Sequence, residues 1–547
     1  MASSEHPSVA AVFEVVFDKR VGHTVSWKRN LPDVSLDGVE YKCLPSGLHG
    51  VREDLVYFVH GAYAGVSAFV LGDADEQQRN ANFVAVGALV PLSFGRLGKS
   101  WIHAAALREL ARERVRDAQR SQGLEQFWKE NKGENSGDGT PVSPSAVRRA
   151  SLPVTAIDAN RKRKRATSDA SGNMFPAMQA FPPDHPAVSM FALLDMFGPL
   201  IFPLHRATLL RKRILLLTTP PVQESCNFVY LLSILSSIPR FLADSLPPES
   251  ELALRIQTLF SVGVHDIPFL GDEKRRERWL ACTTDDILEE KRDLYDVFVR
   301  LPSHTGPSYE WPRIRTADGK DIRATQRDLR RYRLLRAELD RTVPAYQDDP
   351  EEASSDSGGA SSPLMRASTN ALVEEAKHTR PGDSTICEPV SWTAMAYNGF
   401  MWWASAGEME AWENEEARAD RQLLEELPEM EDLAQHMATS SSGDVQGGEP
   451  QVRLKMVAAT VLTAYFHHMT ADILQPLIDA VEEADDATEE GVADAAIHIS
   501  NEDMRAMGLD SWSAADREFV AEALRLYFAR ESKIEEGGLN ICGVRVC

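Results

Sequence analysis

The chain has 547 residues, of which 43% are hydrophobic and 26% are charged, and it carries a formal net charge of −23 at pH 7. This length and composition are typical of a globular protein with two or three domains. The strong negative charge argues against nucleic acid as a partner, because DNA and RNA are polyanions.

The sequence offers no sign of export, membrane insertion or a disulfide framework. Its six cysteines are scattered without a CxxC pair, and the N-terminus lacks the basic start and apolar run of a signal peptide. The longest apolar run, Val188 to Leu204, is interrupted by Asp195, Gly198 and Pro199 and is shorter than a membrane span. We therefore expect a cytoplasmic protein with no transmembrane segment, recruited to membranes only through a partner.

Residues 11–91 alternate short apolar runs with turn residues, which is typical of an antiparallel sheet. The runs are AVFEVVFD and HTVSWKR, which suit a hairpin, then YKCL, LVYFVHG, AGVSAFVLGD and FVAVGALVP. A helix is predicted over about 94–120, because Leu97, Trp101, Ala104 and others recur at steps of three and four residues. The segment 11–129 is therefore expected to form one sheet with a long helix across it.

From 130 to 185 the composition changes to Ser, Gly, Pro and basic residues, which predicts a disordered basic linker. The segment contains RRAS, in which Ser151 is a candidate phosphorylation site for a basophilic kinase. It also contains RKRKR at Arg161 to Arg165, a candidate nuclear-import patch or contact for anionic lipid. A solvated linker without either role is the alternative.

The segment 186–303 is organised around the stretch Arg206 to Ile238. This stretch predicts a continuous apolar strand at Ile214 to Thr218 and then, after a Pro-Pro turn, an apolar helix from about Gln223. A strand without polar alternation must be covered on both faces. A second stretch, Arg278 to Leu301, predicts two strands around a short acidic helix, while ELALRIQTLF is read as a helix and GVHDIPFL as a strand. Together these elements predict a helix-flanked α/β sheet.

The remaining segments are predicted to be mostly helical. Residues 304–346 contain a charged helix, Asp321 to Arg341, with one apolar stripe towards the core and the other face towards solvent. Residues 347–452 are an insertion, partly disordered, with an aromatic stretch at Trp392 to Trp403 and an acidic helix at Glu408 to Leu427.

The tail, 453–547, is predicted to begin with two amphipathic helices, KMVAATVLTAYFHHM and ADILQPLIDAV, and to end in a short strand, LNICGVRVC. Two further helices are expected to start at capping boxes, Ser500 with Asp503 and Ser513 with Asp516, and Gly508 is a predicted helix stop.

Two patterns resemble reactive sites. GRLGKS, at Gly95 to Ser100, follows a strand and precedes a helix as a phosphate-binding P-loop does, yet Ser93 stands where the P-loop needs glycine, so a plain helix start is favoured. His467 and His468 point about 100° apart on a helix, which disfavours a shared metal. We therefore predict no catalytic residue, no cofactor site and no metal site.

Two strings, LLRKRILLLTTPPV and ACTTDDILEEKRDLYDVFV, resemble the LCHN branch of the DENN-domain proteins, in a fungal-type form with long insertions. The resemblance covers about residues 11–130, 186–303 and 453–547. It implies an α/β (α+β) fold with an N-terminal longin-like module at 11–129, a central DENN module at 186–303 and a downstream helical module at 453–547.

The same resemblance implies a function. Many DENN proteins are guanine-nucleotide exchange factors for Rab GTPases, and the Rab sits across the longin-like and DENN modules. Such a factor binds the nucleotide-free GTPase more tightly than the loaded form, so no covalent bond is made or broken. A non-catalytic DENN-fold scaffold or adaptor that binds a GTPase or a trafficking complex is the alternative, since the matching strings lie in predicted core strands. The strings assign no Rab-contacting residue, and the oligomeric state and target membrane stay open.

Overall fold

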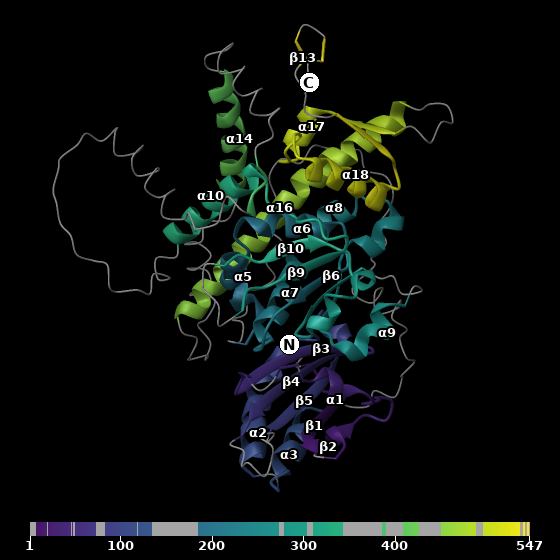
Figure 1. Ribbon diagram of the computed structural model, residues 1–547, viewed down its shortest axis with the longest axis vertical. Coiled ribbons are helices and arrows are strands. Elements are labelled where there is room, and N and C mark those ends of the chain that lie inside the picture. Colours follow the sequence, from purple (N-terminus) through teal and green to yellow (C-terminus); the bar gives the residue numbers. More distant parts are fainter. Residues whose placement is uncertain are drawn as a thin grey trace, which may run out of the picture. The chain divides into compact units, whose positions relative to one another are not determined.

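The computed structural model describes the helices, the strands and most of their connections (Figure 1). The described residues are 7–18, 20–44, 46–47, 50–72, 83–117, 119–133, 184–272, 278–303, 310–342, 386–389, 408–425, 450–487, 496–535, 540–541 and 544–545. Ser151, the patch Arg161 to Arg165 and the aromatic stretch Trp392 to Trp403 lie outside them, as does most of the two predicted linkers.

The chain forms two compact units, each built from three stretches of sequence. The first comprises Met1–Ser189, Arg213–Leu231 and Gln257–His304, and the second comprises Met190–Lys212, Leu232–Ile256 and Thr305–Cys547. Strands dominate the first unit and helices the second, so the predicted mixed α/β class is confirmed. The exact module boundaries drawn from the sequence stay a prediction.

The predicted N-terminal antiparallel sheet is present in the first unit. Its strands are β1 Ala11–Asp18, β2 Gly22–Asn30, β3 Glu53–His60, β4 Tyr63–Leu71 and β5 Phe83–Pro91. The expectation of a strand at YKCL was wrong, because Val39–Lys42 form the short helix α1. Gly38 precedes it with a left-handed φ of 81°, which turns the chain, and Val39 is buried while Tyr41 is exposed.

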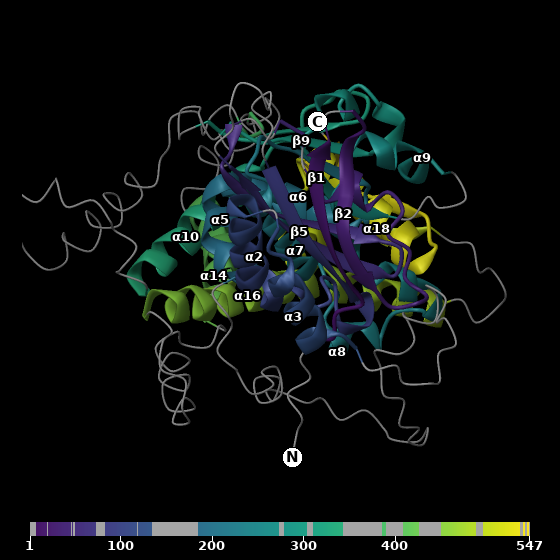
Figure 2. The ribbon, with the colours of Figure 1, turned by 90° about the horizontal axis from the view of Figure 1, so that it is seen from below.

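The helix predicted over 94–120 begins later and is shorter. Two 3-10 turns, η3 Leu92–Phe94 and η4 Ser100–His103, come first, and the α-helix itself, α2, covers Ala104–Arg116. Positive φ angles at Gly95 and Gly98 prevent a regular helix there. α2 packs on β4 and β5, and α3, Gln122–Asn131, follows it. Figure 2 shows α2 beside β5, with α3 next to it.

A second set of strands in the first unit is parallel. It consists of β6 Ile214–Leu217, β7 Gln257–Ser261, β8 Trp279–Thr283 and β9 Val297–Arg300. The apolar runs predicted three of them, β6, β8 and β9, as part of a helix-flanked sheet. β7 also pairs with β3, through Phe58 and Phe260. The strands of the first unit therefore follow one another in a single sheet, in the order β9-β6-β8-β7-β3-β4-β5-β1-β2.

Three predictions between β6 and β9 were wrong in element type. ELALRIQTLF is split between a 3-10 helix, η7 Pro248–Ala253, and strand β7, and GVHDIPFL forms η8 Val264–Asp266 and α9 Ile267–Leu270. The Asp266 carboxylate accepts a hydrogen bond from Gly263 N and so favours a helical turn over a strand. In place of the acidic helix there are two 3-10 turns, η10 Asp286–Leu288 and η11 Arg292–Leu294.

The second unit is mainly helical. Its longer elements are α5 Met190–Phe197, α6 Ile201–Leu209, α10 Gln326–Thr342, α14 Glu408–Glu425, α16 Pro450–Ala487 and α18 Ala514–Phe528. α17, Asn501–Ala506, starts at the predicted capping box of Ser500, and Gly508 follows it with a φ of 71°. Where two tail helices were predicted, α16 is one helix that includes Pro476. In place of one terminal strand there are two short antiparallel strands, β13 Asn540–Ile541 and β14 Val544–Arg545.

One described stretch, Pro186–Leu209, is long and apolar enough to cross a membrane by length and composition, with a mean hydropathy of 1.8. Within its most apolar window 67% is buried inside the protein, and Gly198 and Pro199 divide α5 from α6. Burial in a helical core accounts for its apolar character.

Candidate functional site

The carboxyl ends of β7 and β8 lie beside each other in the first unit, where loops from open parallel sheets often form binding surfaces. Four large apolar side chains near these ends are solvent-exposed: Tyr41 (45%), Val264 (42%), Phe269 (40%) and Ile287 (52%). They come from α1, the turn after β7, α9 and the turn after β8. We call this set the strand-end surface. Exposed apolar groups that gather in this way mark interaction sites.

Helix α1 is fixed to the strand-end surface by a buried carboxylate. Asp266, 5% exposed, accepts a bond from Gly263 N at 3.0 Å through one oxygen and pairs with Lys42 Nζ at 2.8 Å through the other. Lys42 Nζ also donates to Val59 O of β3 at 3.0 Å. The Tyr41 ring is stacked on His265 with 3.9 Å between ring centroids. Tyr41 is therefore held in place by contacts with the turn after β7 and with β3.

The turn after β8 is tied to the same place and is acidic. The Asp285 carboxylate accepts a hydrogen bond from Val264 N at 3.0 Å, and Thr284 Oγ1 accepts one from Ser46 N at 2.9 Å. Asp286 lies 3.7 Å from Arg300, which also pairs with Glu289. The strand-end surface thus combines apolar side chains with a carboxylate rim, which suits a protein partner with apolar and basic groups.

The P-loop-like sequence does not form an open phosphate cradle. A Cβ on Gly98 would lie 2.9 Å from Pro91 O, so the turn packs on the end of its own strand. The Ser100 side chain is fully buried, and it belongs to the 3-10 turn η4. These facts match a plain start of the helical segment.

The two adjacent histidines lie on α16 of the second unit. His467 Nε2 is 3.0 Å from Ile234 O, so one of its ring nitrogens has a structural partner. Among the described residues, no group of three His, Cys, Asp or Glu side chains is arranged to hold a metal ion.

Buried charges that were not predicted from the sequence connect helices of the second unit. Arg206 of α6 makes two bonds to Asp328 of α10, at 3.0 and 2.7 Å, and lies 3.3 Å from Asp516 of α18. Arg331 of α10, predicted only as part of a charged face, is buried and bonds Asp420 of α14 at 2.7 Å. These pairs hold helices together rather than forming a reactive site.

The surroundings of the two aspartates that contact Arg206 shift their pKa values in opposite directions. Burial raises the pKa of Asp516 to about 6, although the charge of Arg206 opposes this. Burial would also raise the pKa of Asp328, but the charge of Arg206 and its hydrogen bonds lower it overall. No local pattern marks this cluster, because its members lie far apart in the sequence.

Comparison with known proteins gives two family matches. Residues 12–310 match the family model of DENN domain-containing protein 11, and residues 387–547 match a domain of unknown function. The first match includes the strand-end surface and the strands of the first unit.

Individual relatives agree with the first match. DENN domain-containing protein 11 of Xenopus laevis is 31% identical over 63% of this chain and 72% of its own length. The Rattus norvegicus protein of the same name is 34% identical over 54% of this chain, which corresponds to 58% of the rat protein's length. The uncharacterized protein ANR2 of Saccharomyces cerevisiae is 25% identical over 99% of this chain and 96% of its own length.

The LCHN-like resemblance seen in the sequence is thus confirmed. The family match covers more than half of the chain, and the frog relative matches over most of its own length. The chain belongs to the DENN domain-containing protein 11 family.

Proposed function

We propose that this protein is a guanine-nucleotide exchange factor for a Rab GTPase in membrane trafficking. Family membership supports this, because DENN-domain proteins commonly act on Rab GTPases. The proposal includes a cytoplasmic location, with recruitment to membranes through the GTPase.

The observation that carries the proposal is the strand-end surface. It draws Tyr41 from the N-terminal part of the first unit and Val264 and Ile287 from the part that follows β7 and β8, on a frame fixed by Asp266. A surface of this kind can hold a GTPase in one arrangement. If that arrangement disfavours bound nucleotide, dissociation is accelerated without covalent chemistry.

The test is the release of fluorescent GDP from a panel of purified Rab GTPases, with the full-length protein in catalytic amounts. We expect faster release for at least one Rab. Ile287→Asp should return that rate to the basal value, because a carboxylate would replace an apolar contact beside an acidic rim. Val21→Asp is the matched control, since Val21 is 76% exposed at the β1–β2 turn, and it should leave release unchanged.

The outcomes separate exchange from the alternative. If a Rab binds and Ile287→Asp weakens binding, but release is unchanged in every case, the protein is a scaffold or adaptor. If no Rab binds or responds, the proposal is wrong.

A further inference from the structure

Strand β2 is an edge strand of the first unit. Among the strands that the structure describes, it pairs with β1 alone. α1 packs against β2. Burial lowers the pKa of His23, at the beginning of the strand, and the nearby Glu40 of α1 opposes this shift, which places α1 at that end. At the other end, Trp27 to Asn30, the edge can present backbone N–H and C=O groups to an additional strand, although Lys28 O accepts a hydrogen bond from the exposed Arg29 side chain at 3.1 Å.

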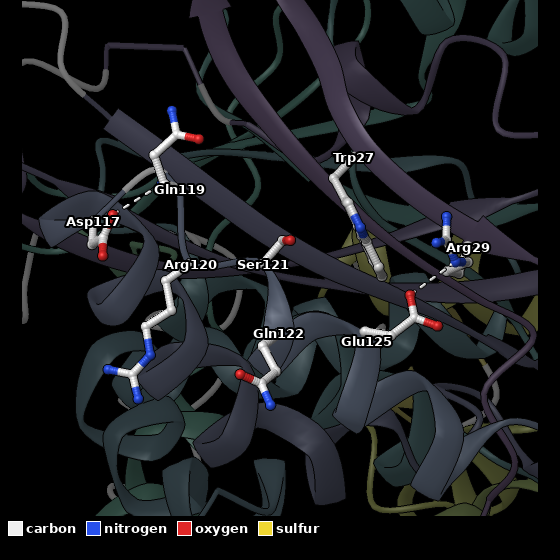
Figure 3. A pocket seen from close by; sticks show the side chains of 8 residues that line it. All are labelled: Trp27, Arg29, Asp117, Gln119, Arg120, Ser121, Gln122 and Glu125. Carbon is white, nitrogen blue, oxygen red and sulfur yellow. Dashed lines mark hydrogen bonds and ion pairs between the residues drawn. The ribbon is translucent and has the colours of Figure 1, made fainter.

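A pocket adjoins this end of β2 (Figure 3). Trp27 lies opposite Glu14 in the β1–β2 register, and Glu14 bonds Arg114 of α2 at 2.5 Å, so Trp27 points to the helix-covered face. The pocket, of about 650 Å³, is bounded by Trp27 and Arg29 on one side and by the segment from Asp117 to Glu125 on the other. It is placed to receive a side chain from a strand added at the edge.

The edge is basic although the whole chain is strongly acidic. Lys28 and Arg29 are exposed on opposite faces of β2, and the strand itself carries no acidic residue. The pocket beside it is mixed in charge, because Arg120 lines it together with Asp117 and Glu125. Arg29 pairs with Glu125 at 3.0 Å, but their side chains are 49% and 32% exposed, so the pair is weak and exchangeable. The Arg29 guanidinium also lies 5.3 Å from the centroid of the Trp27 ring.

We propose that β2 binds an extended, acidic peptide segment of a partner protein as an additional antiparallel or parallel strand. Acidic side chains on alternate positions would meet Arg29 and Arg120 on one face and Lys28 on the other, and one side chain would enter the pocket beside Trp27. A second copy of this chain is disfavoured, because pairing two β2 edges would bring like charges together. Lysine on an edge also discourages aggregation, but that role does not explain the pocket.

The test uses the full-length protein and a fluorescein-labelled peptide in which glutamate alternates with valine, with one central phenylalanine. We expect saturable binding by fluorescence anisotropy, and no binding of the same peptide with lysine for glutamate. Lys28→Glu combined with Arg29→Glu should weaken binding roughly tenfold or more, as expected for losing two charge-assisted contacts. Lys320→Glu combined with Lys533→Glu makes the same charge change at exposed positions of the second unit and should leave binding unchanged.

Hydrogen exchange distinguishes strand addition from a general charge effect. The peptide should slow amide exchange within residues 22–30, and Trp27→Ala should weaken binding while the variant keeps the thermal stability of the wild type. Three results would each overturn the proposal: binding without protection of β2, equal loss in both charge-reversal variants, or concentration-dependent dimers that protect β2 without peptide. Anionic vesicles that bind the protein and protect β2 when the peptide does not would overturn it as well.

Discussion

Asp516 gives the second unit a specific pH dependence. Its pKa is raised to about 6 in the folded protein, so the folded state holds a proton that the unfolded chain releases near pH 4. Its contribution to the free energy of unfolding is therefore largest at low pH and is lost as the pH rises towards 6. Asp516→Asn imitates the neutral acid at every pH, so the variant does not lose this part of the free energy of unfolding as the pH rises.

We therefore expect Asp516→Asn to gain roughly 1–3 kcal/mol relative to wild type between pH 4 and pH 7, since one pKa unit corresponds to about 1.4 kcal/mol. Chemical denaturation at several pH values measures the difference between the two curves. Asp244→Asn, at an exposed carboxylate of the second unit, serves as the control. A constant difference between Asp516→Asn and wild type across this range would show that Asp516 is not the group that titrates.

Single residues were predictable from the sequence where their role is local. Ser500 caps α17 through Asp503, and Gly508 adopts the left-handed conformation after it, because both effects operate within a few residues. Arg206 and Asp516 were not predictable as a pair, since only the tertiary fold brings them within 3.3 Å. The same limit applies to Lys42 and Asp266, whose pairing fixes the candidate site.

Among the elements, buried strands with long apolar runs were predicted well, and β7 was not. β4, β5, β6 and β8 stand out because their residues are apolar on both faces. Three residues separate β7 from the 3-10 turn η7, and Leu252, Leu254 and Ile256 lead into it without a turn residue, so the sequence alone favoured one helix. Its pairing with β3, at the irregular position Phe260, follows from packing in the whole sheet.

Asp54 joins two elements of the first unit, and its removal should be measurable. Its carboxylate, at the start of β3, accepts hydrogen bonds from Val222 N at 2.7 Å and Gln223 N at 3.2 Å, where α7 (Gln223–Leu235) begins. We expect Asp54→Ala to lower the free energy of unfolding by about 1–2 kcal/mol, because buried helix N–H groups lose a charged acceptor.

Thermal unfolding and amide exchange in the first turn of α7 both report this change. Asp54→Asn should have a smaller effect, because its amide oxygen still accepts a hydrogen bond. Asp37→Ala removes an exposed carboxylate that accepts a hydrogen bond from Ser35 in its own turn, and it should leave the exchange of α7 unchanged. Equal exchange of α7 in Asp54→Ala and wild type would contradict the assigned role.

At the scale of the whole molecule, sequence segments and compact units do not coincide. The DENN family match ends at residue 310, and that boundary keeps all of the first unit. A fragment that ends at residue 310 also contains Met190–Lys212 and Leu232–Ile256, which belong to the second unit. It lacks nearly all of Thr305–Cys547, the largest stretch of that unit. The sequence was divided into consecutive modules, and this division missed the interleaving. α5 and α6 lie in the central segment of the sequence, but they pack on helices of the tail.

We therefore expect a fragment of residues 1–310 to be poorly soluble. Without the tail, Phe202 loses its contact with Phe466, Leu209 O loses the hydrogen bond from Tyr527, and Arg206 loses both of its aspartate partners. We expect this fragment to bind the dye ANS and to form aggregates, as measured by fluorescence and light scattering. Truncation after residue 535, which removes the separate hairpin of β13 and β14, should give a monodisperse protein with wild-type thermal stability. A fragment 1–310 that stays monodisperse, binds no ANS and unfolds at the wild-type temperature would show that its apolar helices do not need the tail.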